Sequence, residues 1–441
     1  MTMINAFDIA AAPDMDACDR DLIARRARLL GPAYRLFYAN PVHFVRGEGV
    51  WLYDADGHAF LDVYNNVASV GHCHPHVVQA LSTQAATLNT HTRYLTDGIL
   101  DYAERLLATL PDELAHVMFT CTGSEANDLA YRAARAFTGG TGIIVTQLAY
   151  HGVTIAISEM SPSLGDGITI PPHVRTVPAP NAYRADGADV GETFAAHVRA
   201  AIADMTAHGV KPAALLVDTI FSSDGVFADP AGFLAPAVAA IRDAGGIFIA
   251  DEVQPGFGRT GAGMWGFSRH GVVPDIVTMG KPMGNGHPLA GMVARPDILE
   301  TFGKRTRYFN TFGGNPVSCA VGMAVLDVIE QEGLIANARD VGAYLQSGLR
   351  DLAQRYEIIG DVRGVGLFIG VELVTDRATR TPATDATSRL VNGLREKRVL
   401  ISAAGPHANV LKMRPPLVFS RANADQFLSA MDETLAAITR G

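Results

Sequence analysis

A lysine and an aspartate of this chain have the types and the setting that amine chemistry requires. Lys281 lies in the glycine-rich run Thr-Met-Gly-Lys-Pro-Met-Gly-Asn-Gly, and Asp251 ends an apolar run upstream of it. This pair is what pyridoxal phosphate chemistry needs, because a lysine amine can form a Schiff base with that cofactor and a carboxylate can keep its pyridine nitrogen protonated. Most lysines are solvated surface groups. One that follows a core strand is partly desolvated, so its pKa falls toward that of a usable nucleophile and base.

Asp251 is expected at the carboxyl edge of a buried strand, where a charged group needs a partner. A pyridinium nitrogen would be one. The alternative, that Asp251 caps a following helix, is disfavoured by Pro255 and Gly256. Gln254 is placed to reach the phenolic oxygen of the cofactor, and Val253 to cover one face of its ring.

A candidate phosphate-binding turn lies at residues 119–127, Phe-Thr-Cys-Thr-Gly-Ser-Glu-Ala-Asn, where a strand passes through small residues into a helix. Gly123 lets the backbone approach an anion, Ser124 offers a hydroxyl, and the free amides of the first helical turn add donors. An ordinary serine-capped helix fits the same residues. The run matches neither a Walker loop nor a GxGxxG fingerprint, so a nucleotide is not indicated.

Tyr150 follows the apolar run Gly142–Val145 after a short loop. An aromatic side chain at the carboxyl end of a strand can stack on a flat cofactor, because sites in open α/β sheets gather there. Taken alone, such a tyrosine is more often a packing residue.

Short apolar runs must position these residues. The runs lack the alternation of half-exposed strands and therefore predict strands buried on both faces. They are His116–Cys121, Gly142–Val145, Ala213–Val217, Gly246–Ala250 and Asp275–Met279. Amphipathic segments such as Ser124–Phe137 and Pro230–Ala244 alternate with them. Strands that alternate with helices predict an α/β fold with a mainly parallel sheet flanked by helices.

The chain is expected to divide into three parts. Residues 61–329 form a large domain with the sheet, residues 330–441 a smaller α+β domain, and residues 1–60 an N-terminal segment that packs with the smaller domain. The elements predicted outside the large sheet are helices at Asp19–Leu30, Pro316–Glu330, Leu334–Tyr356 and Ala422–Thr439, a hairpin of His43–Arg46 and Val50–Tyr53, and strands at Gly366–Leu373 and Val410–Met413.

Length and composition describe a globular protein with a sizeable core. Of 441 residues, 48% are hydrophobic and 18% are charged, and the formal net charge is −9. This acidic balance gives no footprint for nucleic acid or an anionic membrane, and no apolar stretch reaches the ~18 residues of a membrane span. Residues 1–19 lack the basic and apolar regions of a signal peptide. Because the four cysteines form no CxxC pair, we expect no metal site and a cytoplasmic protein.

Together these motifs resemble those of the class III aminotransferases, which are pyridoxal phosphate enzymes of fold type I. The resemblance extends from about Phe37 to about Ala437. It implies a large domain with a mainly parallel seven-stranded sheet and a smaller α+β domain. It also implies that Lys281 is the Schiff-base lysine that moves the substrate proton, and that Asp251 is the partner of the pyridine nitrogen.

The same resemblance assigns the remaining cofactor contacts. Tyr150 and Val253 stack on the ring, and Gly123 and Ser124 form the phosphate cup. Thr311, in Phe-Asn-Thr-Phe-Gly-Gly-Asn, matches a threonine that reaches the phosphate of the neighbouring subunit; taken alone it would pass as a turn residue. The implied assembly is a homodimer with shared active sites, or a tetramer.

Two positions depart from the pattern of many family members. The family has a glutamate opening a Glu-Pro pair where this chain has Asp218-Thr219, and an arginine three residues before a Pro-Pro pair where it has Lys412. Those family residues pair and help select between amino donor and carboxylate acceptor. Here the pair would be Asp218 with Lys412, without bidentate geometry. Arg414 is an alternative partner for a substrate carboxylate, although both cations also fit a strand surface.

Four further runs narrow the resemblance: Tyr64-Asn65-Asn66-Val67-Ala68, Gly71-His72-Cys73-His74-Pro75-His76, Leu88-Asn89-Thr90 and Arg93-Tyr94-Leu95. They resemble the branch that contains alanine–glyoxylate aminotransferase 2-like proteins and ethanolamine-phosphate phospholyase. The three histidines alternate within a turn that contains proline, which favours a loop bordering the site over a metal centre.

That branch contains lyases as well as aminotransferases, and both begin with loss of the same α-proton, so the fold cannot separate them. We predict an aminotransferase that passes the amino group of an amino acid or amine to a keto acid or aldehyde in a ping-pong cycle. The alternative is a lyase that expels a β-substituent such as phosphate or water, for which Arg93 and Lys412 are candidate cations. A non-catalytic binding protein is disfavoured, because every matched cofactor position holds a competent residue.

Overall fold

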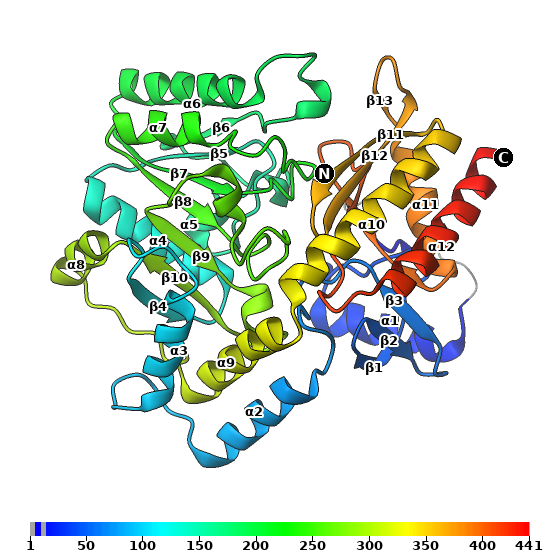
Figure 1. The fold of residues 1–441 in the computed structure, drawn as a ribbon, viewed down its shortest axis with the longest axis horizontal. Helices are drawn as coiled ribbons and strands as arrows, with labels where there is room; N and C mark the ends of the chain where they lie inside the picture. The colour runs from blue at the N-terminus through cyan, green and yellow to red at the C-terminus, as the bar shows by residue number, and fades with distance from the viewer. Residues whose placement is uncertain (1–4, 10–14, 441) are drawn as a thin grey trace.

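A sheet of seven strands lies at the centre of the larger part of the computed structural model, which describes residues 5–9 and 15–440 (Figure 1). The strand order is β4-β10-β9-β8-β7-β5-β6, and every neighbouring pair is parallel except the two that β10 makes. The strands are β4 (His116–Thr120), β5 (Gly142–Thr146), β6 (Val174–Val177), β7 (Pro212–Asp218), β8 (Ile247–Asp251), β9 (Ile276–Met279) and β10 (Ala290–Ala294). The five strands predicted from apolar runs are confirmed to within one residue at each end, and β6 and β10 are additional.

Side chains of the central strands alternate between the two faces of this sheet. On β8, Ile247 and Ile249 belong to one core, and Phe248 and Ala250 belong to the core on the opposite face. Helices α4 (Gly123–Thr138) and α8 (Pro296–Arg305) cover the first face, and α6 (Val190–Ala207) and α7 (Ala235–Asp243) cover the second. Helix α7 begins later than predicted because Pro236 occupies its first turn, the one place in a helix that tolerates proline.

A second sheet lies on the other side of the molecule in Figure 1, beneath the long helix α10 (Leu334–Arg355). Its strands follow the order β11-β12-β16-β15, with β13 paired to β12. These strands are β11 (Ile359–Val365), β12 (Phe368–Asp376), β13 (Thr381–Pro382), β15 (Ser402–Ala404) and β16 (Val410–Met413), and the further helices of this part are α11 (Thr384–Glu396) and α12 (Arg421–Arg440). Helix α9 (Pro316–Gln331) leads into it and packs on α2 (Pro75–Thr87) and α3 (Asp97–Leu107).

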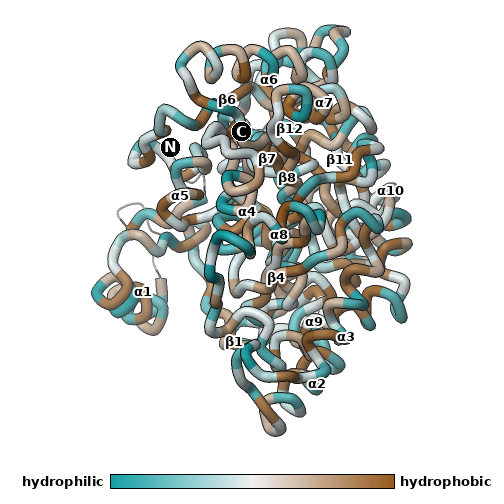
Figure 2. The backbone as a smooth tube through the Cα atoms, turned by 90° about the vertical axis from the view of Figure 1, so that its left-hand side faces the viewer, coloured by the Kyte–Doolittle hydropathy of each residue, from teal (hydrophilic) through white to brown (hydrophobic). Residues whose placement is uncertain are grey.

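A small third sheet joins the two ends of the chain. Strands β1 (Phe44–Glu48), β2 (Trp51–Asp54) and β3 (Ala59–Asp62) are extended by β14 (Val399–Leu400), which pairs parallel to β3. Helix α1 (Ala17–Leu30) buries no residue and stands apart from the body of the molecule in Figure 2.

Residues 1–4 and 10–14 of the predicted N-terminal segment lie outside the described residues, and the domain boundaries near residues 60 and 329 stay predictions. Within the part of the chain that the structure describes, no helix combines the length and the apolar character needed to cross a membrane.

Candidate active site

The carboxyl ends of three neighbouring strands place polar side chains abreast. In the parallel register of β7, β8 and β9, Asp218 pairs with Asp251, and Asp251 pairs with Thr278. Because side chains alternate along a strand, Asp251 lies on the same face as Ile249, which is the face that α4 covers. A carboxylate at the sheet edge is thereby aimed at the start of α4.

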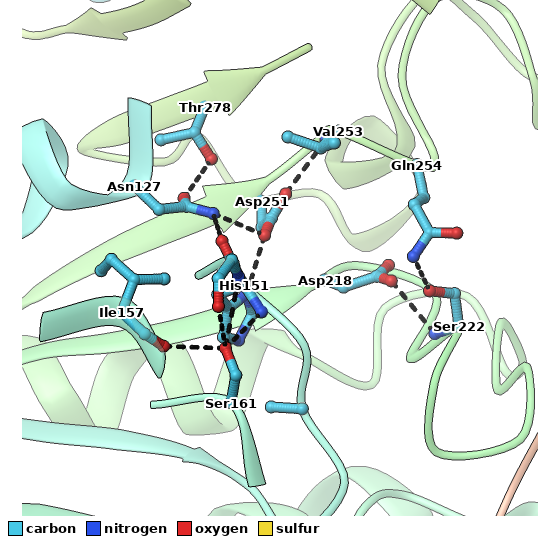
Figure 3. A network of polar contacts seen from close by, with 12 residues as sticks. Asn127, His151, Ile157, Ser161, Asp218, Ser222, Asp251, Val253, Gln254 and Thr278 are labelled. Carbon is cyan, nitrogen blue, oxygen red and sulfur yellow. Dashed lines mark hydrogen bonds and ion pairs between the residues drawn. The ribbon is translucent and has the colours of Figure 1, made fainter. Parts of the chain in front are cut away.

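Asp251 is buried and accepts hydrogen bonds from several directions (Figure 3). Its Oδ2 accepts from Asn127 Nδ2 at 2.9 Å and lies 2.7 Å from His151 Nδ1, and its Oδ1 accepts from the Val253 amide at 3.1 Å. Asn127 Oδ1 in turn accepts from Thr278 Oγ1 at 2.6 Å. These partners hold the carboxylate in one orientation.

The motifs of the sequence did not single out Asn127, His151 or Thr278 as functional residues. A signal existed for two of them, because Asn127 closes the candidate phosphate-binding run and His151 follows Tyr150 directly. Only the register of β8 and β9 reveals Thr278. Among the described residues, the buried Nε2 of His151 has no hydrogen-bond partner.

The start of α4 has the form that a phosphate group requires. Thr122 caps the helix, so Ser124 does not act as the cap and its hydroxyl is available to a ligand. The Val153 amide donates to Ser124 Oγ at 3.1 Å. Gly152 has a φ of +140°, and a Cβ there would lie 2.5 Å from Ser124 Oγ, so only glycine allows this close approach.

Lys281 begins the single-turn helix η5 (Lys281–Gly284), directly after β9 and Gly280, and has a positive φ of 26°. Its Nζ lies 5.9 Å from the centre of the Tyr150 ring. Burial, and next the charge of Arg414, lower the pKa of Lys281 to about 8, while Asp251 and Asp218 oppose the shift. An appreciable fraction of this amine is therefore unprotonated near neutral pH, as a nucleophile or base requires.

Two cavities meet at Lys281. The smaller has a volume of about 80 Å³ and is lined by Gly123, Ser124, Asn127, Tyr150, His151, Gly152, Asp218, Asp251, Val253, Gln254 and Lys281. The larger, of about 330 Å³, has a mainly apolar wall from Leu36, Phe37, Tyr38, Pro41, Val42, Phe44, Leu52 and Leu400 and a polar wall from Asp62, Tyr64, Asn65, Asn66 and Arg414. The smaller cavity fits pyridoxal phosphate in its chemistry: a glycine and serine cradle, a carboxylate on the α4 face, a flanking aromatic ring and a lysine of low pKa.

Two of the predicted site residues lie elsewhere in this chain. The Arg93 guanidinium stacks on the Phe309 ring at 3.8 Å, beside a separate cavity of about 420 Å³. Thr311 is exposed on the same loop as Phe309. Neither residue lines a cavity with Lys281.

Asp218 and Lys412 do not form the direct pair that the sequence predicted. Asp218 accepts from the backbone amides of Ile220 at 3.0 Å and Ser222 at 3.1 Å, because the turn after β7 closes on its carboxylate. Lys412 Nζ donates to the Ser222 carbonyl at 3.3 Å. The two charges are thus joined through Ser222.

Lys412 and Arg414 are both buried, each with 8% of its surface exposed, so neither is the strand-surface cation of the alternative interpretation. Burial, and next the charge of Arg414, hold the pKa of Lys412 well below its ordinary value. Arg414 donates to Gln254 Oε1 and lies 4.5 Å from the centre of the Tyr64 ring. The side chain of Gln254, which was expected at the cofactor, also donates to Ser222 Oγ at 2.6 Å.

The histidines of residues 72–76 face different acidic groups. His72 Nε2 lies 2.8 Å from Asp62 at the wall of the larger cavity. His74 and His76 contact acidic residues in or next to α9.

Comparison with known proteins gives a consistent result. The family model of the class III aminotransferases matches residues 37–435. An alanine–glyoxylate aminotransferase 2-like protein of Drosophila melanogaster is 43% identical over 95% of this chain and 87% of its own length. Ethanolamine-phosphate phospho-lyase homolog 1 of Caenorhabditis elegans is 37% identical over 100% of both chains.

Solved structures agree with these matches. A phospholyase from Arthrobacter in complex with phosphoethanolamine is 45% identical, with a TM-score of 0.91 over 95% of this chain and 100% of its own. An aminotransferase of Bacillus anthracis is 26% identical, with a TM-score of 0.87 over 96% of this chain and 100% of its own.

Proposed function

The chain belongs to the class III aminotransferases, which are pyridoxal phosphate enzymes of fold type I, and from this premise we propose that it is a lyase that eliminates phosphate from a small phosphorylated amine such as phosphoethanolamine. One observation carries the proposal. Arg414 and Lys412 stand buried near Lys281, and within the described part of the chain neither forms an ion pair with a carboxylate within 4.0 Å.

Charge favours a phosphate group over a carboxylate at these cations. A phosphate monoester carries up to two negative charges, and partly desolvated cations interact with it more strongly than with a single charge. Asp218 is poorly placed to neutralise them in place of a substrate, because the turn that contains Ser222 engages its carboxylate. The larger cavity, which Arg414 lines, is therefore suited to binding the phosphate group of a substrate.

The residues of the site would divide the reaction among them. Pyridoxal phosphate, when bound, supplies the electron sink that makes the hydrogen on the amine-bearing carbon acidic. Lys281 Nζ, with its lowered pKa, takes that proton. Asp251, held by Asn127 and His151, keeps the proton on the ring nitrogen.

Arg414, which lines the larger cavity, would hold the phosphate group at the start and receive its growing charge as it departs, with Lys412 buried nearby. The bond between the β-carbon and the ester oxygen breaks, and the phosphate leaves with the electron pair. Phosphoethanolamine and water thus become acetaldehyde, ammonia and phosphate, with atoms and charge balanced.

Amino transfer is the second candidate, and the alanine–glyoxylate aminotransferase 2-like relative favours it. It requires the same proton abstraction by Lys281, followed by return of the nitrogen to a keto acid or aldehyde acceptor. The two candidates differ in whether an acceptor is consumed.

The test is a product balance on the purified holoenzyme. With phosphoethanolamine and no keto acid, a lyase releases phosphate, ammonia and acetaldehyde in equal amounts. With alanine and glyoxylate, an aminotransferase forms pyruvate and glycine and releases no ammonia. Amino transfer without phosphate release would overturn the lyase assignment.

We also propose a homodimer with shared active sites. Thr311 is exposed, its neighbour Phe312 is 67% exposed, and Arg93 lies at a cavity away from Lys281, so these groups are free to meet a second copy. Sedimentation of the holoenzyme as a monomer would overturn this assembly. The cytoplasm stays the predicted location.

A further inference from the structure

Asp62 lines the larger cavity with Arg414, and the reaction proposed above gives it no role. It ends β3 and is 1% exposed. Its Oδ1 accepts from the amides of Tyr64 at 3.0 Å and Asn65 at 2.8 Å, and its Oδ2 lies 2.8 Å from His72 Nε2. Burying a carboxylate is costly. The Asp62 carboxylate closes the tight turn of residues 62–65 beside the cavity.

That turn surrounds Arg414. The Arg414 amide donates to the Val63 carbonyl at 2.9 Å, and the Tyr64 ring lies 4.5 Å from the guanidinium. Asn66 Nδ2 donates at 3.1 Å to the carbonyl of Gln254, whose side chain accepts from Arg414. Neighbouring residues of one turn therefore contact the backbone of Arg414, the face of its guanidinium and its hydrogen-bond partner.

A second buried arginine lies behind the same segment. Arg259 is 1% exposed and donates to the carbonyls of Leu367 and Pro415, and its Nε and Nη2 have no partner among the described residues. Burial, and next the charge of Arg414, lower the pKa of Arg259 to about 9, and the charge of Asp62 opposes them. Asp62 is therefore an acid whose field reaches this buried cation.

We propose that Asp62 is a positioning residue for the substrate anion: it closes the turn that carries Tyr64 and so holds the Arg414 guanidinium in the orientation that binds the anionic group. Its negative charge also offsets that of the buried Arg259. Asp62 does not touch the reacting carbon. The inference rests on the proposed function, because it takes Arg414 as the ligand of the substrate anion.

Asp54 offers a matched control. Its carboxylate also accepts from two backbone amides, of Asp56 at 3.1 Å and His58 at 2.8 Å, and lies 3.0 Å from a histidine ring nitrogen. Asp54 precedes the same kind of turn, between β2 and β3, but lines neither cavity at Lys281. A general effect on folding would appear in both positions, and a loss of substrate positioning only at Asp62.

The experiment measures steady-state phosphate release from phosphoethanolamine by the holoenzyme. We expect Asp62→Ala to raise KM about tenfold or more, while kcat falls less than about threefold, because ground-state binding of a charged group is lost. Asp62→Asn keeps one acceptor oxygen for the turn and is expected to lie between Asp62→Ala and the wild type. Asp54→Ala is expected to match the wild type.

Calorimetry of inorganic phosphate binding to the holoenzyme gives a readout without turnover. Weaker phosphate binding in Asp62→Ala, with unchanged binding in Asp54→Ala, supports the inference. It does so even if the wild type releases no phosphate from phosphoethanolamine, because that result alone refutes only the proposed function.

A KM and a phosphate affinity of wild-type size in Asp62→Ala overturn the inference. So does a joint loss of kcat, cofactor content and Tm at unchanged KM. If Asp62→Ala does not fold, Asp62→Asn decides on the same criteria. A wild type with neither activity nor phosphate binding refutes both proposals.

Discussion

The two sides of Lys281 are built in different ways. On the cofactor side, Asp251 ends β8, Thr278 pairs with it near the end of β9, and Asn127 lies near the start of the helix that covers them. On the substrate side, the cavity wall comes from segments that are far apart in the chain, among them Leu36–Tyr38, Tyr64–Val67 and Arg414. The first side is a layer of regular structure in which hydrogen bonds join Asp251, Asn127 and Thr278. The second is an assembly of segments from distant parts of the chain, and several of its residues, such as Tyr64, Asn65 and Arg414, lie outside helices and strands.

This difference explains where chemistry and specificity reside. A group fixed by strand register and several hydrogen bonds stays in place through many turnovers, which suits a cofactor whose chemistry is common to a family. Connecting segments change between relatives more readily than core strands. The choice of substrate, and with it the fate of the activated amine, is therefore expected to depend on the side of Arg414 and Asp62.

The strongest test of the shared centre is Lys281→Ala. We expect turnover to fall by at least about a thousandfold for elimination and transfer alike, because the base and nucleophile is removed. Cofactor should still bind, but without covalent attachment, as absorbance before and after dialysis would reveal. Lys304→Ala, at a lysine whose side chain is 77% exposed, is the control. Normal turnover in Lys281→Ala would refute the assignment of the whole site.

A change on the cofactor side should lower the rate for every substrate. Asp251→Asn is expected to reduce kcat about a hundredfold or more, since a neutral amide does not hold a proton on the ring nitrogen as a carboxylate does. The measurement is kcat with phosphoethanolamine and with an amine that lacks phosphate. Asp297→Asn on the surface helix α8 is the control. A loss of kcat confined to one substrate would contradict the assignment of Asp251 to the chemistry that all substrates share.

A change on the substrate side should act on binding and should depend on the substrate. Arg414→Met keeps a long side chain without the charge, and we expect KM for phosphoethanolamine to rise about thirtyfold, with a smaller change in kcat. Arg421→Met, at an exposed arginine, is the control. Equal effects of Arg414→Met on phosphorylated and unphosphorylated amines would show that Arg414 does not recognise the phosphate group.

The smallest expected effect is a shift in the pKa of Lys281 when Arg414, on the substrate side, is changed. Lys281 has a pKa of about 8 in the folded protein, so capture of added pyridoxal phosphate by the cofactor-free protein should accelerate as pH rises and level off above about 8. The charge of Arg414 contributes to this lowering, so in Arg414→Met the pKa of Lys281 should increase and the midpoint should move to higher pH. Stopped-flow absorbance measures the capture rate. A midpoint that moves to lower pH would contradict the direction of the coupling.

The parts of the fold that the sequence predicted are those with a strong local signal. Strands buried on both faces appear as continuous apolar runs, and the helices that cover them have an apolar stripe. Strand β6 was not predicted because its two middle residues, Arg175 and Thr176, are only partly buried at the sheet edge. Strand β10 was not predicted because Ala290, Gly291 and Ala294 have little β-propensity; pairing with β4 and β9 holds it in place.

By itself, the sequence determined the family, the cofactor, and the lysine and aspartate around which a site could form. Lys281 and Asp251 could be recognised because each lies next to a strand or turn that has its own local pattern. Only the tertiary structure decided that His151, Asn127 and Thr278 converge with Asp251, that Ser222 separates Asp218 from Lys412, and that the turn of Asp62 surrounds Arg414. Periodicity and turn chemistry act over a few residues. These contacts join segments that meet only when the strands take their register and the sheets pack together, so no local pattern encodes them.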